Sequence, residues 1–123
     1  MRFAIDFDGT CVEHKFPQVG EDVPGAGEVL KELVAKGHRL ILYTMRSDKF
    51  LKQAVEWFKM RGIPLYGIQY DPQQALWTST NKCDADCVID DRNLGIPLIH
   101  PVTGRPYVDW PAVKQMLIDM GAL

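Results

Sequence analysis

The sequence predicts one α/β domain in which a parallel sheet lies between layers of helices. Short apolar segments alternate along the chain with segments whose apolar residues recur at helical spacing, the pattern of strands joined by crossover helices. One apolar segment, residues 38–44 (HRLILYT), contains a continuous apolar run typical of a strand covered on both faces. With 123 residues, 46% of them hydrophobic, the chain is long enough to bury one core.

Four apolar segments are predicted strands, and a short fifth follows them. Each is bounded by glycine, proline or a polar stretch that separates it from the neighbouring elements. The predicted strands comprise residues 3–7, 38–44, 65–70, 85–90 and 97–101.

Three segments are predicted helices because their apolar residues fall on one helical face. The first covers residues 26–37 and ends in a glycine, as many helices do. The second begins at Ser47 or Asp48. The third is capped by Asp109, with Pro111 in its first turn.

Composition excludes several classes of protein. The net charge of −2 argues against a general nucleic-acid binder, which usually carries a basic excess. No apolar stretch approaches the roughly 18 residues of a membrane span, and Asp6 and Asp8 interrupt any apolar core of a signal peptide. Three cysteines make an odd number, so we expect reduced thiols and a cytoplasmic location.

Polar side chains follow or precede three of the predicted strands. The carboxyl ends of parallel strands form the crevice in which such sheets bind ligands, so residues there are the first candidates for a site. If the first, second and fourth strands are neighbours, these residues converge. They are Asp6, Asp8, Thr44, Lys82, Asp90 and Asp91.

Four carboxylates at one rim repel one another in a partly desolvated site, and a divalent cation resolves that repulsion. Magnesium prefers oxygen ligands and retains waters, so two or three protein oxygens suffice. A cation, Lys82 and a hydroxyl together suit a phosphate group. We therefore expect Mg²⁺ and a phosphorylated substrate, with Asp6, Asp8, Asp90 and Asp91 as candidate ligands.

Asp6 and Asp8 lie on the same face of a strand, because side chains alternate with period two. One carboxylate can attack phosphorus while the other moves a proton, and aspartyl-phosphates are a known covalent strategy. Gly9 allows a tight turn beside the phosphate, and Thr10 offers a hydroxyl.

These residues resemble the motifs of the haloacid dehalogenase (HAD) superfamily. The first motif, Asp-x-Asp-Gly-Thr after an apolar strand, is matched by residues 6–10 (DFDGT). The second, an apolar strand ending in Thr or Ser, is matched at Thr44, and the third, a lysine, by Lys82. The fourth, an apolar strand ending in acidic residues, is matched at residues 90–91.

The resemblance implies a three-layer Rossmann-like fold with helices on both faces of the sheet and an Mg²⁺-dependent phosphatase activity. Asp6 is then the nucleophile and a metal ligand. Asp8 is the general acid/base, and its backbone carbonyl is a second ligand. Asp90 is the third protein ligand, with Asp91 near the metal or its waters.

The resemblance further implies that Thr44 and Lys82 hold the phosphoryl oxygens, beside Gly9 and Thr10. Lys49 and Lys52 compete with Lys82 for the third motif. Arg46 is a candidate contact to the substrate, and an ion pair within the protein is the alternative. None of the histidines is assigned to the chemistry.

Other functions remain open from the sequence. A phosphotransferase, or a non-catalytic binding or scaffold protein of HAD type, fits the same motifs. A phosphoacceptor receiver domain also carries an acidic pair, a Thr and a Lys. Its acceptor follows strand three, where only Asp71 is available here, and the position of the second acidic pair disfavours this class.

No segment is long enough for the cap domain that many HAD phosphatases carry. We expect only a short flap at about residues 11–23 and one domain over residues 1–123. An uncapped pocket predicts a bulky substrate or a lid from a neighbouring subunit. Trp77 and Trp110, which we expect to be exposed, are the residues that favour a homo-oligomer.

Overall fold

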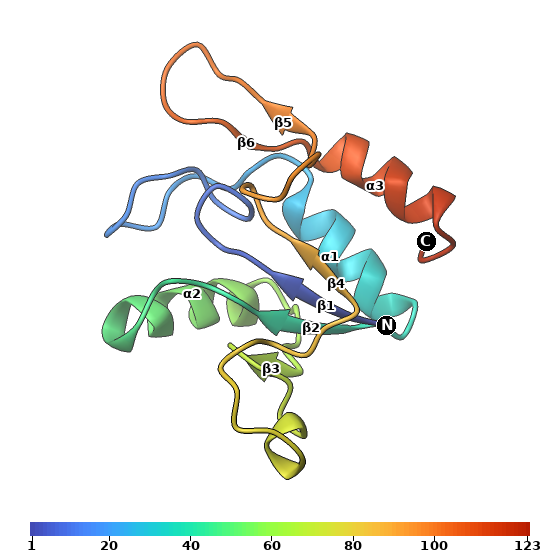
Figure 1. Cartoon of the computed structure of the whole chain (residues 1–123). Coiled ribbons are helices and arrows are strands. Elements are labelled where there is room, and N and C mark those ends of the chain that lie inside the picture. The colour runs from blue at the N-terminus through green and yellow to red at the C-terminus, as the bar shows by residue number, and fades with distance from the viewer.

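A four-stranded parallel sheet with strand order β3-β2-β1-β4 forms the centre of the computed structural model, which describes all residues from 1 to 123 (Figure 1). The strands are β1 (Arg2–Ile5), β2 (Arg39–Leu42), β3 (Gly67–Ile68) and β4 (Cys87–Ile89). The α-helices are α1 (Ala26–Ala35), α2 (Asp48–Met60) and α3 (Trp110–Asp119). The prediction of a parallel α/β fold without a cap domain is confirmed.

Strand β1 is central and pairs with both β2 and β4. Ala4 lies opposite Ile41 on one side and Val88 on the other, so the three strands run in parallel and in step. The first, second and fourth predicted strands are therefore neighbours. The loops that follow them leave the same edge of the sheet.

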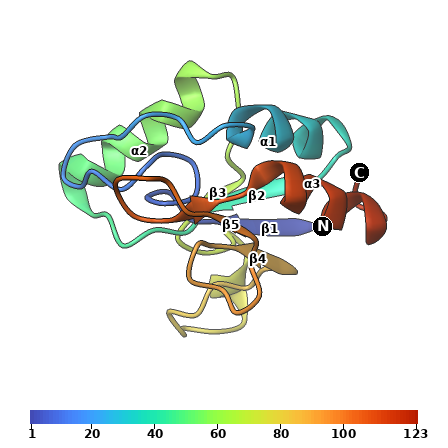
Figure 2. The ribbon, with the colours of Figure 1, turned by 90° about the horizontal axis from the view of Figure 1, so that it is seen from above.

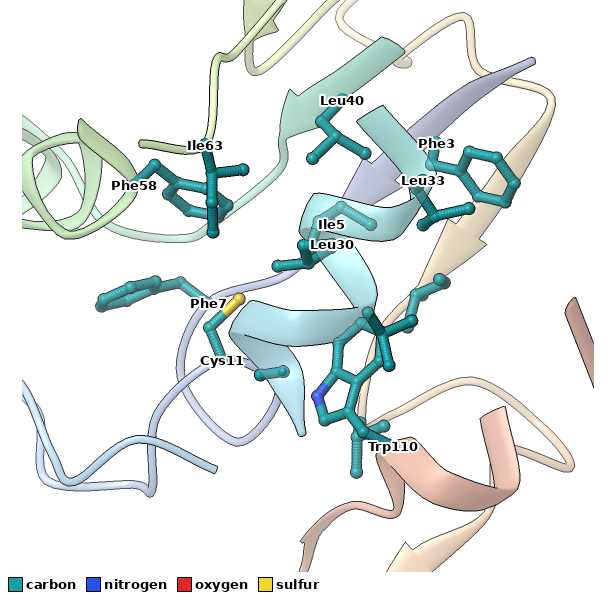
Figure 3. Close-up of a cluster of buried hydrophobic side chains, with 14 of the residues drawn as sticks. Phe3, Ile5, Phe7, Cys11, Leu30, Leu33, Leu40, Phe58, Ile63 and Trp110 are labelled. Carbon is teal, nitrogen blue, oxygen red and sulfur yellow. The ribbon is translucent and has the colours of Figure 1, made fainter. Parts of the chain in front are cut away.

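One face of the sheet carries all three α-helices. Alternate residues of β1 and the loop after it, Phe3, Ile5 and Phe7, are fully buried against them (Figure 3). Leu40 and Leu42 of β2 join the same hydrophobic cluster, which includes buried residues of α1, α2 and α3. The apolar stripes predicted for the helices thus meet in one core.

The other face is covered by residues 69–86, which contain only a short 3₁₀ helix, η1 (Gln74–Leu76) (Figure 2). The expected α-helix on this face is absent because the segment is polar and has no helical periodicity. Arg2 of β1 holds the segment by ion pairs with Asp71, Asp84 and Asp86.

The predicted ends of two helices are confirmed. Gly37, with φ of +89°, follows the last turn of α1, a conformation that costs glycine little. The Asp109 carboxylate caps α3 by accepting a hydrogen bond from the Ala112 amide at 3.1 Å. None of the helices has the length and apolar character that a membrane span requires.

A hairpin outside the main sheet extends the predicted fifth strand. Strand β5 (Leu98–Ile99) pairs antiparallel with β6 (Tyr107–Val108), which the sequence did not predict because only two residues follow Pro106 before the cap of α3. The Val108 amide donates to the Gly9 carbonyl at 3.0 Å, so the hairpin adjoins the loop after β1.

The expected flap at residues 11–23 is a loop closed at its base. The Val23 amide donates to the Cys11 carbonyl at 2.9 Å, and the Glu13 amide donates to the Glu21 carbonyl at 2.9 Å. These bonds bring both ends of the flap together beside the end of β1.

The expectation that Trp110 is exposed is wrong. Its side chain is fully buried, and its indole N–H donates to the Thr10 carbonyl at 2.7 Å (Figure 3). This bond ties α3 to the loop after β1. Trp77, in contrast, is 70% exposed.

We expect Trp110→Phe to lower the free energy of unfolding by about 1–3 kcal/mol, because the buried Thr10 carbonyl loses its donor. Trp77→Phe is the matched control and should change it by less than about 0.5 kcal/mol. Urea denaturation of both variants measures the difference. Equal losses in the two variants would contradict this account of the α3 attachment.

Candidate active site

A cavity of about 290 Å³ lies beyond the carboxyl ends of β1, β2 and β4. Its residues come from the loops after these three strands and from the flap. The lining residues are Asp6, Asp8, His14, Phe16, Thr44, Met45, Arg46, Asp90, Asp91 and Arg92. The structure thus brings together six of the predicted site residues, and Gly9 and Thr10 lie directly behind them.

Three carboxylates, Asp6, Asp90 and Asp91, form an acidic triad in which one oxygen from each lies within 4.8 Å of the others. Burial and the charges of Asp90 and Asp91 raise the pKa of Asp6 to about 8. Burial also raises the pKa of Asp90. No Lys or Arg side chain forms an ion pair with the triad, so its charges are not compensated by a permanent cation.

Thr10 fixes the position of Asp6 from behind. Its hydroxyl donates to Asp6 Oδ2 at 2.8 Å and accepts from the Asp91 amide at 3.2 Å. Thr10 is fully buried and does not line the cavity. The expected contact between Thr10 and a phosphate is therefore corrected to a positioning role.

Asp8 forms a two-pronged ion pair with Arg46, and both N–O distances are 2.8 Å. Its carboxylate is engaged by Arg46 and is not a member of the acidic triad, so only the backbone carbonyl of Asp8, the atom that the family resemblance assigns to the metal, is available as a ligand. The backbone carbonyl of Asp8 accepts no hydrogen bond from the protein and remains free as an oxygen ligand.

Arg46 uses all five of its N–H groups within the protein. Besides Asp8, they donate to the carbonyls of Pro17, Gln18 and Phe50. The guanidinium is buried, 5.1 Å from the ring centres of both Phe7 and Phe16. Of the two predictions for Arg46, the structure supports the ion pair within the protein rather than a contact to the substrate, because no N–H donor remains for a phosphate.

Gly9 leaves room for a histidine that sequence reasoning did not assign. A Cβ at this position would overlap the imidazole of His14 and lie 2.6 Å from Asp91 Oδ2. His14 Nε2 lies 2.9 Å from the same Asp91 oxygen. The Gly9 amide is bonded to the Val12 carbonyl at 2.7 Å, so its expected contact with a phosphate is not available in this structure.

Thr44 lies on the cavity wall and is held there by Gln69, a residue that the sequence did not single out. The Thr44 amide donates to the Gln69 side-chain carbonyl at 2.9 Å, and the Gln69 amide group donates to the Thr44 carbonyl at 2.7 Å. The Thr44 hydroxyl accepts from the Arg46 amide at 3.1 Å, which leaves its own hydrogen free for a ligand. The one feature of the sequence that could have indicated this role of Gln69 is that a polar residue directly follows β3.

Lys82 does not line the cavity. Its carbonyl accepts from the Gln74 side chain at 2.9 Å, within the segment that covers the second face of the sheet. The expected contact of Lys82 with a phosphate is therefore corrected. Its place before β4 in the sequence puts it toward the start of that strand, whereas the cavity lies at its end.

Asp6 should make the metal-free protein less stable as pH rises. Its pKa is about 8 in the folded state and 3.8 ordinarily, so between these values the folded state holds a proton that the unfolded state releases. The free energy of unfolding therefore falls with rising pH across this window. Asp6→Asn removes the titration, so in EDTA its melting temperature should exceed that of the wild type increasingly from about pH 5 to pH 9. A difference that does not vary with pH would contradict the uncompensated triad.

No family model matches the chain, and no curated protein is similar to it. A solved structure of a conserved protein from Bacteroides thetaiotaomicron superposes on it with a TM-score of 0.81 and 40% sequence identity. The match covers 98% of this chain and 91% of that chain. Identity at this level over nearly the whole of both chains indicates common descent, and the chain belongs to the same family as this conserved Bacteroides protein.

Proposed function

We propose that the chain is a magnesium-dependent phosphomonoesterase of HAD type that acts through an aspartyl-phosphate on Asp6. The observation that carries the proposal is the acidic triad itself. Three carboxylates meet at the carboxyl ends of the central strands, in a cavity, without a Lys or Arg partner. Such an arrangement is costly unless a cation or proton compensates it.

The donor set suits magnesium. Asp6, Asp90 and Asp91 offer carboxylate oxygens, and the free Asp8 carbonyl is a further oxygen donor. No cysteine lines the cavity, so the ligands are those of a hard cation rather than of zinc in a thiolate site. When bound, the cation would neutralise the triad and the negative charge of a phosphate.

The residues of the cavity can perform both halves of a phosphate ester hydrolysis. The Asp6 carboxylate, oriented by Thr10, attacks phosphorus while the bond to the leaving oxygen breaks. The leaving oxygen takes a proton from Asp8. Water then attacks phosphorus and gives its proton to Asp8, which releases inorganic phosphate and restores Asp6. Arg46 holds the ionised Asp8 at the cavity, and the acid form of Asp8 that protonates the leaving oxygen has to give up one prong of this ion pair.

The position of Asp71 supports this proposal over a receiver domain. Asp71 is the only carboxylate placed to follow the third strand, where a receiver carries its phosphorylated residue. In the structure it is buried and paired with Arg2 at 2.8 Å, and it does not line the cavity. Transfer to an acceptor other than water uses the same residues, and product analysis separates a phosphotransferase from a phosphatase.

The flap, which contributes His14 and Phe16 to the cavity, and the β5–β6 hairpin both project from the body of the fold (Figure 1). No inserted domain separates the cavity from solvent. We propose that the substrate carries its phosphate on a bulky molecule, since an uncapped site can accommodate one. Of the two tryptophans that favoured a homo-oligomer, only Trp77 is exposed.

Asp6→Asn should reduce hydrolysis of p-nitrophenyl phosphate to background, because the attacking charge is removed and a metal ligand is weakened. Asp8→Asn should be severely impaired but accumulate phosphoenzyme, since attack can proceed when the later proton transfer cannot. Steady-state assays and mass spectrometry of the intact protein measure these outcomes. Near-normal turnover by Asp6→Asn would rule out the covalent mechanism.

Magnesium should raise the melting temperature of the wild type. A ligand that binds only the folded state adds about 2.7 kcal/mol of stability at a hundredfold excess over its Kd. Asp90→Ala should reduce the shift, whereas Asp71→Ala, which lies outside the cavity, should retain it. Melting curves in magnesium and in EDTA provide the measurement, and identical wild-type curves would refute the metal site.

A further inference from the structure

The cavity contains three side chains that can carry positive charge, His14, Arg46 and Arg92. Lys82, which the family resemblance assigns to the phosphate, is not among them. A dianionic phosphate beside four carboxylates needs a cationic partner in addition to the metal. One of these three side chains is therefore the candidate partner for the phosphate.

Two of these three side chains are already engaged. Arg46 donates all five N–H groups to Asp8 and to carbonyls of the flap and α2. His14 contacts Asp91 through Nε2 at 2.9 Å. Arg46 can therefore offer no donor to a phosphate without giving up contacts that build the cavity, and the imidazole of His14 has no pair of parallel N–H donors to offer.

Arg92 is free. Its side chain lines the cavity, is exposed and forms no hydrogen bond or ion pair with the protein. Its backbone amide donates to Asp90 Oδ1 at 2.9 Å, which fixes the residue directly beside the acidic triad. A planar guanidinium binds two phosphate oxygens at once, and the pairing is stronger when both groups are charged.

We propose that Arg92 binds the phosphoryl oxygens of the substrate, in place of Lys82. The inference rests on the proposed function, since it names a phosphate-binding residue of the same cavity. Thr44, with its free hydroxyl hydrogen, is the neutral donor on the wall formed by the loop after β2.

The test compares Arg92→Ala and Lys82→Ala, which each remove one positive charge from an exposed side chain. Calorimetric titration of the magnesium-loaded proteins with inorganic phosphate gives the affinity, and p-nitrophenyl phosphate gives kcat and KM. We expect Arg92→Ala to weaken phosphate binding by about tenfold to a hundredfold. Lys82→Ala should stay within about twofold of the wild type, and Arg92→Lys should recover part of the loss.

Other outcomes of these measurements would contradict either the inference or the proposed function. Equal losses in the two alanine variants would show that only the net charge matters and would overturn the inference, as would an unchanged affinity in Arg92→Ala. Melting temperatures close to that of the wild type confirm that both variants are folded, as expected for side chains on the surface. A wild type that neither binds phosphate nor hydrolyses the ester would instead refute the proposed function, and the inference with it.

Discussion

The ion pair between Asp8 and Arg46 joins three of the four parts that line the cavity. Asp8 belongs to the loop after β1, and Arg46 to the loop after β2. The same guanidinium binds carbonyls of the flap at Pro17 and Gln18. Because the pair is largely buried, removal of either partner leaves an uncompensated charge, which is strongly destabilising. The walls formed by the loops after β1 and β2 and by the flap therefore depend on this one interaction.

The acidic triad has the opposite character, because no Lys or Arg side chain is paired with it. Asp6 is held by Thr10, whose carbonyl is in turn held by Trp110 of α3. Rigid supports thus keep like charges close together, an arrangement that lowers the stability of the metal-free protein and prepares oxygen ligands for a cation. Stability and the proposed activity make opposing demands at these residues.

Periodicity and strand-end chemistry predicted most of the fold and the acidic residues of the site, because both depend on local sequence. The parallel strands, the cap at Asp109 and the convergence of Asp6 with Asp90 all follow from such patterns. The roles of His14 and Gln69 depend on where loops turn in space, and no local pattern reports that. The prediction for Lys82 was wrong for the same reason. The sequence shows that Lys82 precedes β4, but not that it lies near the start of this strand, away from the cavity at its end.

Strand β1 and the loop after it serve the core and the cavity with alternate residues. Phe3, Ile5 and Phe7 face the helices, while Asp6 and Asp8 reach the cavity. A shift of one residue in this strand would exchange the two sets, burying carboxylates and exposing aromatic rings. An insertion or deletion here therefore cannot change the cavity residues and leave the core intact, so the cavity and the core constrain the same short segment.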